Sequence, residues 1–194
     1  MDTERFLIRP MTVEDIPRLT EIRPGFVSDT YLDVEREGDG YLISWRLVEK
    51  RLEKPFDKGN AYDFTLDERR NIQHRLLQQE SLEEVVIDRH SGRIVGVLDM
   101  TIEEWRWVSW IWNIMLDQDV RRQGIGRVLI EHSIAWTKRH KLRAVMLETQ
   151  TNNVPACKFY AKMGFQLVGL NEVFYTNRDH QRREIALFWS YALR

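Results

Sequence analysis

The feature that most constrains the fold is a glycine-containing turn between a strand pattern and a helix pattern. Residues 108–116 are rich in β-branched and aromatic side chains, which favour a strand. Residues 125–140 carry apolar side chains at helical spacing. Gly124 and Gly126 stand where the two patterns meet, and the missing Cβ lets the backbone there approach a ligand closely. The chain therefore has to pass from strand to helix within a few residues.

This turn has the properties of a phosphate-binding site. The first turn of the helix exposes unpaired N–H groups, and the positive end of the helix dipole favours an anion. Arg121, Arg122 and Arg127 add positive charge that complements a pyrophosphate. The alternative interpretation is a glycine-rich turn with a solvated basic edge, because short motifs of this kind also occur without a ligand.

Two other phosphate-binding motifs do not fit the turn. A P-loop continues from its glycines into Lys and then Ser or Thr, but Gly126 is followed by Arg127 and Val128. A dinucleotide fingerprint ends on a third small residue, whereas Leu129 occupies the corresponding position here. The turn therefore belongs to neither motif.

Strand and helix patterns mix along the whole chain, without a repeat or a linker. A strong turn signal at residues 37–40 predicts a long β-hairpin over residues 30–53. Further strands are predicted at 5–9, 84–88, 93–102, 144–147, 165–170 and 184–191, helices after the N-cap Thr12 and at 66–80 and 154–163, and a loop at 55–62. We predict one mixed α/β domain over residues 1–194.

Composition excludes several classes of protein. The chain is 43% hydrophobic and 30% charged with a formal net charge of -1, so no global positive field draws it to nucleic acid or anionic lipid. It has no apolar run of the roughly 20 residues that a membrane span needs and no apolar signal core, which predicts a cytoplasmic protein. The single cysteine, Cys157, excludes an internal disulfide. The five histidines lack metal-ligand spacing, so we predict no metal.

Two motifs together resemble the GNAT acetyltransferase superfamily. Arg-x-x-Gly-x-Gly at residues 121–126 is similar to the family's pyrophosphate motif, and Asn153, Ala156, Tyr160 and Gly164-Phe165 follow the pattern of its second half. The resemblance implies a central, mixed, mostly antiparallel sheet of about seven strands flanked by helices. It also implies an acetyl-CoA-binding core at about 94–170, with a substrate-side hairpin and helix insertion at about 28–80.

A narrower resemblance is to the streptothricin acetyltransferases, which are antibiotic-resistance enzymes within this superfamily. It rests on the segments 134–136, 147–153, 156–160 and 186–189. It implies acetyl transfer from acetyl-CoA to a primary amine of a small cationic molecule, by direct attack in a ternary complex. A homodimer is compatible with this interpretation. The alternatives are acetylation of a protein or peptide amine, and a degenerate module that binds acetyl-CoA without catalysis.

The resemblance also assigns roles to residues. It implies that Tyr160 protonates the departing thiolate and that the N–H of Leu116 stabilises the oxyanion. The residues implied to hold acetyl-CoA are Ile114, Met115, Leu116, Arg121, Arg122, Gln123, Gly124, Ile125, Gly126, Arg127, Asn153, Ala156 and Tyr160.

No general base can be taken from the family. Many members carry acids at the positions where this chain has Trp112-Asn113. Glu148 is one candidate, and Glu103 and Glu104 are others, although each carboxylate is more often simply solvated or paired. Because an alkylamine with a pKa of about 10.4 is mostly charged at pH 7, some group has to accept its proton.

Three further features have a structural and a functional interpretation. Alternation places Trp110 and Trp112 on one face of the sheet, where they serve the core or attract a cationic amine. The acids of the hairpin (Asp33, Glu35, Glu37 and Asp39) either attract a polycation or keep the hairpin soluble. Cys157, with no histidine beside it in the sequence, is predicted to be a buried structural residue rather than an acetyl carrier.

Overall fold

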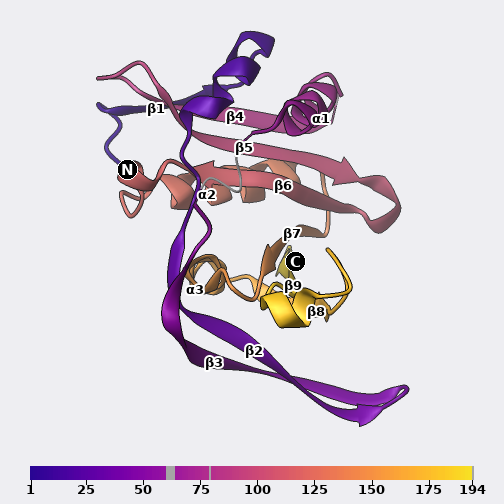
Figure 1. Cartoon of the computed structure of the whole chain (residues 1–194). Helices are drawn as coiled ribbons and strands as arrows, with labels where there is room; N and C mark the ends of the chain where they lie inside the picture. The colour runs from indigo at the N-terminus through magenta and orange to yellow at the C-terminus, as the bar shows by residue number, and fades with distance from the viewer. Residues whose placement is uncertain (60–63, 79, 194) are drawn as a thin grey trace. The chain divides into compact units, whose positions relative to one another are not determined.

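Seven strands form one sheet in the order β1-β4-β5-β6-β7-β9-β8 (Figure 1). The structure is a computed structural model that describes residues 1–59, 64–78 and 80–193. The strands are β1 (Phe6–Pro10), β4 (Ser81–Asp88), β5 (Ile94–Glu103), β6 (Val108–Leu116), β7 (Ala144–Gln150), β8 (Gln166–Asn171) and β9 (Ala186–Ala192). The pairs β1/β4, β4/β5 and β5/β6 are antiparallel, and β6/β7 is parallel. The predicted mixed, mostly antiparallel seven-stranded sheet is confirmed.

The chain divides into two compact units. Unit 1 comprises residues 1–25, 59–147 and 190–194, and unit 2 comprises residues 26–58 and 148–189. Strands β7 and β9 each contribute residues to both units. The predicted substrate-side insertion at 28–80 is thereby divided, because its hairpin belongs to unit 2 and its helix to unit 1. A single domain over 1–194 stays a prediction.

The core of unit 1 lies where helices cover β4 and β5. The 3₁₀ helix η1 (Val13–Glu21) packs against α1 (Leu66–Leu76) and β5, and α1 packs against β4 and β5. The buried side chains of this core are Met11, Ile16, Leu19, Ile22, Phe64, Ile72, Val85, Ile94 and Val97. A second helix, α2 (Ile125–Arg139), contacts β6 and runs behind it in Figure 1. The helix predicted over 125–140 is confirmed.

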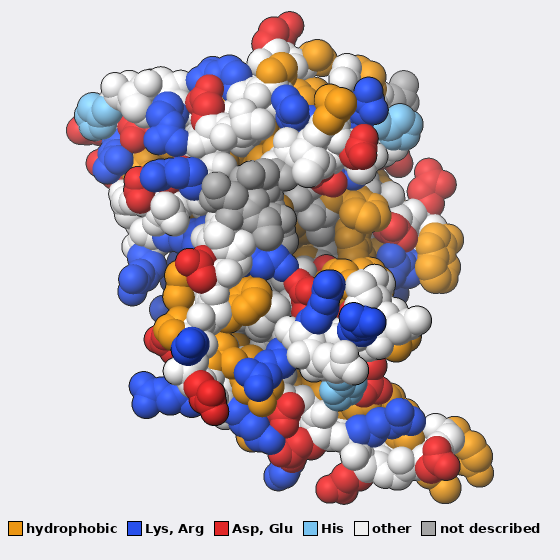
Figure 2. Space-filling view, viewed as in Figure 1, with side chains coloured by type: hydrophobic (Ala, Val, Ile, Leu, Met, Phe, Trp, Pro, Cys, Tyr) orange, Lys and Arg blue, Asp and Glu red, His pale blue; other side chains and the backbone are white. Residues whose placement is uncertain are grey.

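Unit 2 is built around the hairpin of β2 (Val27–Asp39) and β3 (Leu42–Asp57). A side chain on Gly38 (φ +89°) would place its Cβ 1.9 Å from the carbonyl oxygen of Leu42, so the turn requires glycine there. Helix α3 (Val154–Lys162) packs on β2, and α4 (Asp179–Arg182) follows β8. Hydrophobic side chains gather at the end of the hairpin (Figure 2), where Tyr41 and Leu42 are 92% and 71% exposed.

Several predicted boundaries were wrong. The segment after Thr12 is a 3₁₀ helix rather than an α-helix, because Pro17 lacks the N–H that an α-helical bond to Val13 would need. The loop predicted from residue 55 starts too early, since β3 continues to Asp57, and residues 60–62 of that loop lie outside the described residues. Helix α1 ends at Leu76 instead of residue 80, and residue 79 also lies outside the description. The short helix α4 was not predicted.

A buried polar network joins α1 to β5 and β6. The guanidinium of Arg75 forms an ion pair with the fully buried Asp99 at 2.6 Å. The carboxamide of Asn113 donates to Asp99 and to Glu68, each at 2.8 Å. The ladder between β5 and β6 pairs Asp99 with Asn113 but Met100 with Ile111, so Trp112 is the extra residue of a β-bulge. The network therefore fixes the bulge that precedes residues 114–116.

Glu83 lies at the buried end of this network. It is paired in register with Asp99 across β4 and β5 and is only 5% exposed. Neither of its carboxyl oxygens has a hydrogen-bond partner with ordinary geometry within the described chain. Burial, reinforced by the Asp99 carboxylate, raises the pKa of Glu83 to about 11. Glu83 is therefore neutral at pH 7, which avoids two adjacent buried charges.

We predict that Glu83→Gln makes the protein more stable at pH 8 and reduces the dependence of its stability on pH. In the native state Glu83 keeps its proton, whereas in the unfolded chain it loses the proton above pH 4.3 or so, so stability falls as pH rises between these two pKa values. The loss approaches about 1.4 kcal/mol per pH unit, and glutamine removes it. Urea unfolding at pH 5 to 8 measures the effect, with Glu131→Gln on the exposed side of α2 as the control. A variant less stable than the parent at pH 8 would show that Glu83 is ionised in the native state.

Candidate acetyl-CoA site

The turn between β6 and α2 has a backbone suited to an anion. After the 3₁₀ turn η3 (Gln118–Val120), Arg122 and Gly124 both have positive φ angles, of 60° and 83°. Gly124 is the N-cap residue of α2, so no side chain occupies the N–H groups of the helix's first turn. Turns with such alternating backbone conformations direct successive N–H groups into a concave surface that binds anions.

The three arginines of the turn have different environments. Arg121 is half-buried, and its guanidinium donates to the carbonyl oxygens of Leu116 (3.0 and 3.2 Å) and Pro24 (2.7 Å). Burial lowers the pKa of Arg121 from its ordinary value. Arg122 and Arg127 are exposed. Arg121 thus ties the turn to the end of β6, while the other two arginines present their charge to solvent.

A carboxylate that the sequence analysis did not identify holds the same turn. Asp117 is 1% exposed and accepts hydrogen bonds from the backbone N–H of Arg23 (3.1 Å), from its guanidinium (2.9 and 3.1 Å) and from the N–H of Asp119 (3.0 Å). Burial alone would raise the pKa of Asp117, but these donors hold it below its ordinary value. Arg23 is distant in sequence, so no local pattern could have indicated this contact.

Strand β6 leaves its parallel neighbour before it ends. The pairing with β7 runs from Val108 to Ile111, while β6 continues to Leu116 with β5 as its partner. Within the described residues, the edge of β6 that faces away from β5 therefore has no ladder partner beyond Ile111. This is the segment that contains Ile114, Met115 and Leu116, all half-buried. Backbone groups along such an edge can bind a ligand, although the carbonyl oxygen of Leu116 already accepts hydrogen bonds from Arg121.

In unit 2, Asn153 and Ala156 build the start of α3. Asn153 is the N-cap residue, and its side-chain oxygen accepts a hydrogen bond from the N–H of Ala156 at 3.2 Å. Both residues are half-buried. The capping bond explains why an asparagine suits this position without any cofactor, so the predicted contacts of Asn153 and Ala156 with acetyl-CoA stay predictions.

Tyr160 lies in an aromatic cluster within unit 2. It is 7% exposed, and its ring centroid lies 5.4 Å from that of Phe159, 5.8 Å from Phe165 and 6.3 Å from Trp189. Gly164, with a φ of 91°, ends α3 and lets Phe165 turn back onto the tyrosine. The Gly-Phe pair of the sequence motif therefore helps to fix the ring of Tyr160.

Of the three carboxylates considered as a general base, Glu148 has a pKa shifted toward neutrality. Burial raises its pKa to about 7, although hydrogen bonds from the Tyr175 hydroxyl and Gln150 act in the opposite direction. A pKa near the working pH is the property that a general base requires. Glu103 is instead paired with Arg106 at 2.7 Å, and Glu104 is exposed. No local pattern in the sequence indicates Tyr175, since its contact with Glu148 spans 27 positions.

Cys157 does not have the properties of an acetyl carrier. It is 4% exposed, and burial raises the pKa of its thiol to about 12. Its sulfur lies 3.7 Å from the carbonyl oxygen of Gln150. A thiol in this state has almost no thiolate at neutral pH and is a poor nucleophile.

Two remaining observations bear on metals and membranes. No cluster of His, Cys, Asp and Glu residues suited to a metal ion occurs in the described part of the chain. Among the same residues, no helix is long and apolar enough to cross a membrane.

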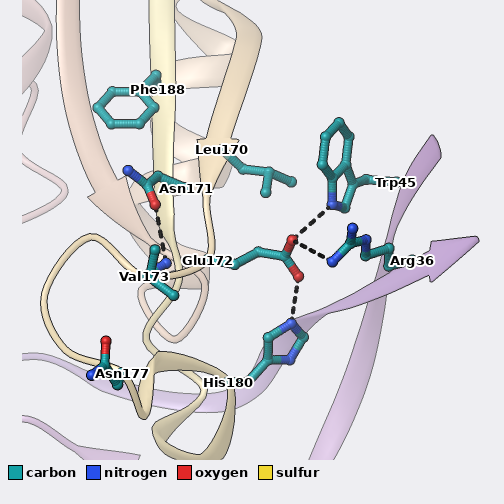
Figure 3. A pocket seen from close by; sticks show the side chains of 9 residues that line it. All are labelled: Arg36, Trp45, Leu170, Asn171, Glu172, Val173, Asn177, His180 and Phe188. Atoms are coloured by element: carbon teal, nitrogen blue, oxygen red, sulfur yellow. Dashed lines mark hydrogen bonds and ion pairs between the residues drawn. The ribbon is translucent and has the colours of Figure 1, made fainter. Parts of the chain in front are cut away.

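A hollow of about 640 Å³ lies within unit 2 (Figure 3). Its walls come from the hairpin, from the end of β8 and the segment that follows it, and from β9. The residues that line it are Arg36, Trp45, Leu170, Asn171, Glu172, Val173, Asn177, His180 and Phe188. At its centre the carboxylate of Glu172 accepts hydrogen bonds from Trp45 and His180. The sequence analysis identified neither Glu172 nor His180 as a site residue.

Some of the acids of the hairpin already form ion pairs with basic residues and are less available to a cationic ligand. Asp33 and Glu35 both pair with Lys50, and Glu35 also pairs with Arg46. Half of the four acids proposed to attract a polycation are therefore neutralised within the hairpin itself.

Comparison with known proteins agrees with the geometry. The chain is 28% identical over 176 residues to streptothricin acetyltransferase of Escherichia coli, an alignment that covers 91% of this chain and 90% of the relative. The structure of nourseothricin acetyltransferase superposes with a TM-score of 0.79 at 24% identity and covers 97% of this chain and 98% of the other. A Bacillus anthracis protein assigned as a streptothricin acetyltransferase, solved with acetyl coenzyme A, gives 0.76 at 22% identity and the same coverage.

At these identities the two solved structures establish the fold. The assignment to a family comes from residues 44–165, which match the model described as the acetyltransferase (GNAT) family. This segment includes the turn at 121–127, the start of α2 with its N-cap Gly124, and Tyr160, and it covers more than half of the chain. The chain therefore belongs to the acetyltransferase (GNAT) family.

Proposed function

We propose that this acetyltransferase transfers the acetyl group of acetyl-CoA to a primary amine of a small cationic molecule, and that streptothricin-type antibiotics are its acceptors. The observation that carries the acetyl-CoA assignment is the turn at 121–127, with its two positive φ angles and no side chain on the N-terminus of α2. The acceptor class is supported by the relative from E. coli, which aligns along 91% of the chain. A small-molecule acceptor and a cytoplasmic location are parts of the same proposal.

The proposed contacts with the cofactor follow from the two groups of residues. In unit 1, the N–H groups of residues 122–127 and the exposed arginines Arg122 and Arg127 hold the pyrophosphate. Arg121 contributes by fixing the turn through its bonds to Leu116 and Pro24. Backbone groups of β6 at 114–116 supply hydrogen bonds to the pantetheine arm, and Asn153, Ala156 and Tyr160 are also proposed to contact the cofactor.

The reaction needs one nucleophile, one proton acceptor and one proton donor. The neutral amine nitrogen attacks the thioester carbonyl carbon, and the N–H of Leu116 stabilises the oxyanion that forms. Glu148 takes the proton that the nitrogen loses. When the C–S bond breaks, the electron pair stays on sulfur and Tyr160 donates a proton to it, which gives CoA and the acetamide. Because Cys157 is buried and protonated, the acetyl group passes directly from CoA to the amine.

One assay distinguishes this function from its alternatives. Acetyl-CoA is offered with streptothricin, with simple alkylamines and with peptides that carry a free amino terminus, and the release of free thiol is followed. We expect turnover with streptothricin and none with peptides. Turnover with peptides alone would make the chain a protein acetyltransferase. Tight binding of acetyl-CoA without turnover of any amine would make it a binding module.

We predict that Gly124→Asp weakens the binding of acetyl-CoA more than tenfold, because it places a carboxylate against the phosphates. The positive φ of residue 124 strains any side chain, and Gly124→Asn imposes the same strain without the charge. Calorimetry on both variants separates the two effects. Gly169→Asp, at a glycine with open space around it, is the control. Equal affinity of the Gly124→Asp and Gly124→Asn variants would mean that the phosphates bind elsewhere.

We predict that kcat/KM, calculated for the neutral form of the amine, rises with pH through about 7, as Glu148 loses its proton and becomes able to accept one. Glu148→Gln should lower kcat by roughly 10²- to 10⁴-fold and abolish this rise, with the KM for acetyl-CoA unchanged. Glu103→Gln, which removes an acid already paired with Arg106, should leave the profile intact. A pH profile that keeps its rise near 7 in the Glu148→Gln enzyme would assign the base to another residue.

We predict that Tyr160→Phe lowers kcat by roughly 10²-fold, because the thiolate then leaves without a proton donor. The ring contacts with Phe159, Phe165 and Trp189 do not need the hydroxyl, so folding and cofactor affinity should change little. Thermal melts and calorimetry check these two properties, and Tyr41→Phe on the exposed hairpin is the control. A fully active Tyr160→Phe enzyme would remove the hydroxyl from the mechanism.

A further inference from the structure

The hollow of Figure 3 has one acidic group at its centre and aromatic rings in its walls. Glu172 receives the indole N–H of Trp45 at 3.1 Å and the imidazole of His180 at 2.7 Å. Its side chain is 19% exposed, so the carboxylate still reaches solvent. Burial alone would raise its pKa, yet the two donors hold the pKa of Glu172 below its ordinary value. Glu172 therefore stays charged at neutral pH.

A third group, the guanidinium of Arg36, also approaches the carboxylate of Glu172, but at a longer distance. Its guanidinium nitrogen lies 4.0 Å from the oxygen of Glu172, and its side chain is 46% exposed. Figure 3 shows the guanidinium beside the carboxylate, next to the ring of Trp45. An exposed ion pair at this distance contributes little to stability, so another cation can displace it at low cost. Arg36 marks the place where a ligand's positive group would lie.

The same contacts make an anionic ligand unsuitable. The basic side chains of the lining, Arg36 and His180, are both directed at Glu172, so an anion would have to approach the carboxylate or displace it. A cation meets the carboxylate and the indole of Trp45, whose face attracts positive charge. The side chains of Asn171 and Asn177 also line the hollow. The side-chain oxygen of Asn171 already accepts the N–H of Val173 at 3.0 Å, while the oxygen of Asn177 can accept a hydrogen bond from an ammonium or guanidinium group.

We propose that this hollow binds a positively charged group of the acceptor, an ammonium or a guanidinium, other than the amine that receives the acetyl group. This proposal rests on the proposed function and names a subsite for it. Glu172 is then a specificity residue, and Arg36 is an internal competitor for the same place. With a volume of about 640 Å³, the hollow has room for such a group and the chain that carries it.

The first test measures binding alone and uses agmatine, which carries a guanidinium and a primary amine. The imidazole signals of His180, assigned with His180→Gln, are followed by NMR during a titration without acetyl-CoA. We expect Glu172→Gln to weaken binding about tenfold or more, because the charge-assisted hydrogen bonds are lost. We expect Arg36→Ala to tighten binding several-fold. Glu53→Gln, an exposed acid of β3 outside the hollow, should change nothing.

The proposal predicts that Glu172→Gln weakens agmatine binding and that Arg36→Ala tightens it. These opposite changes in affinity distinguish a binding role from a structural one. If Glu172 and Arg36 only stabilise the hairpin, both substitutions should weaken binding or leave it unchanged, and thermal melts should fall in both. That pattern, or a titration that leaves the His180 signals unmoved, would overturn the proposal.

The second test is kinetic and separates this proposal from the proposed function. Glu172→Gln should raise the KM for streptothricin about tenfold, with kcat and the KM for the monoamine butylamine unchanged. An equal rise for both acceptors would contradict the subsite. Absence of acetylation with every amine would instead contradict the proposed function, while the agmatine titration would still decide whether the hollow binds cations.

Discussion

The hydrogen bonds of the Asp117 carboxylate are the interactions on which the turn between β6 and α2 depends. A buried carboxylate without partners would cost several kcal/mol, but this one accepts bonds from the backbone and side chain of Arg23 and from the N–H of Asp119. The N–H of Asp117 itself donates to the carbonyl oxygen of Val95 on β5 at 2.8 Å. One residue therefore fastens the end of β6 to the neighbouring strand and to the segment after η1.

Arg121 complements Asp117 with the opposite charge. It donates to the carbonyl oxygens of Leu116 and Pro24, so the start of the turn is held to the end of β6 and to the segment after η1. Rigid N–H groups lose little further entropy when they bind an anion, which is the advantage of preorganisation. This also explains why an arginine of the motif can matter for cofactor binding although its guanidinium contacts only carbonyl oxygens of the protein.

The parts of the fold that were predictable are those that local sequence encodes. The hairpin, the glycine turn and helix α2 rest on turn residues and apolar spacing within short windows, and all three are present. The prediction failed at two prolines: Pro17 lies inside η1, which is a 3₁₀ helix, and Pro55 lies within β3, although a loop was predicted from residue 55. Turn residues and proline positions thus predict that an element exists better than where it ends.

The candidate site also combines a feature that local sequence encodes with contacts that it does not encode. The turn at 121–127 could be read from sequence, but the contacts of Asp117 with Arg23 and of Glu148 with Tyr175 join residues 94 and 27 positions apart. The sequence shows plainly that Asn113 stands where many family members carry an acid. It does not show what this difference does to the structure. Only the structure shows that the carboxamide bridges Asp99 and Glu68, so a neutral donor at 113 fits a place already surrounded by acids.

The pKa of Glu148 also limits when the proposed proton transfer can occur. A free alkylammonium has a pKa of about 10.4, so moving its proton to a carboxylate with a pKa of about 7 costs roughly 5 kcal/mol. Once the nitrogen has bonded to the acetyl carbon, its N–H becomes far more acidic and the same transfer is downhill. Glu148 is therefore suited to take the proton during or after attack, rather than from the incoming ammonium. The acceptor then has to reach the thioester as the neutral amine, and its remaining positive charges, not the reacting nitrogen, are the ones that acidic groups such as Glu172 can recognise.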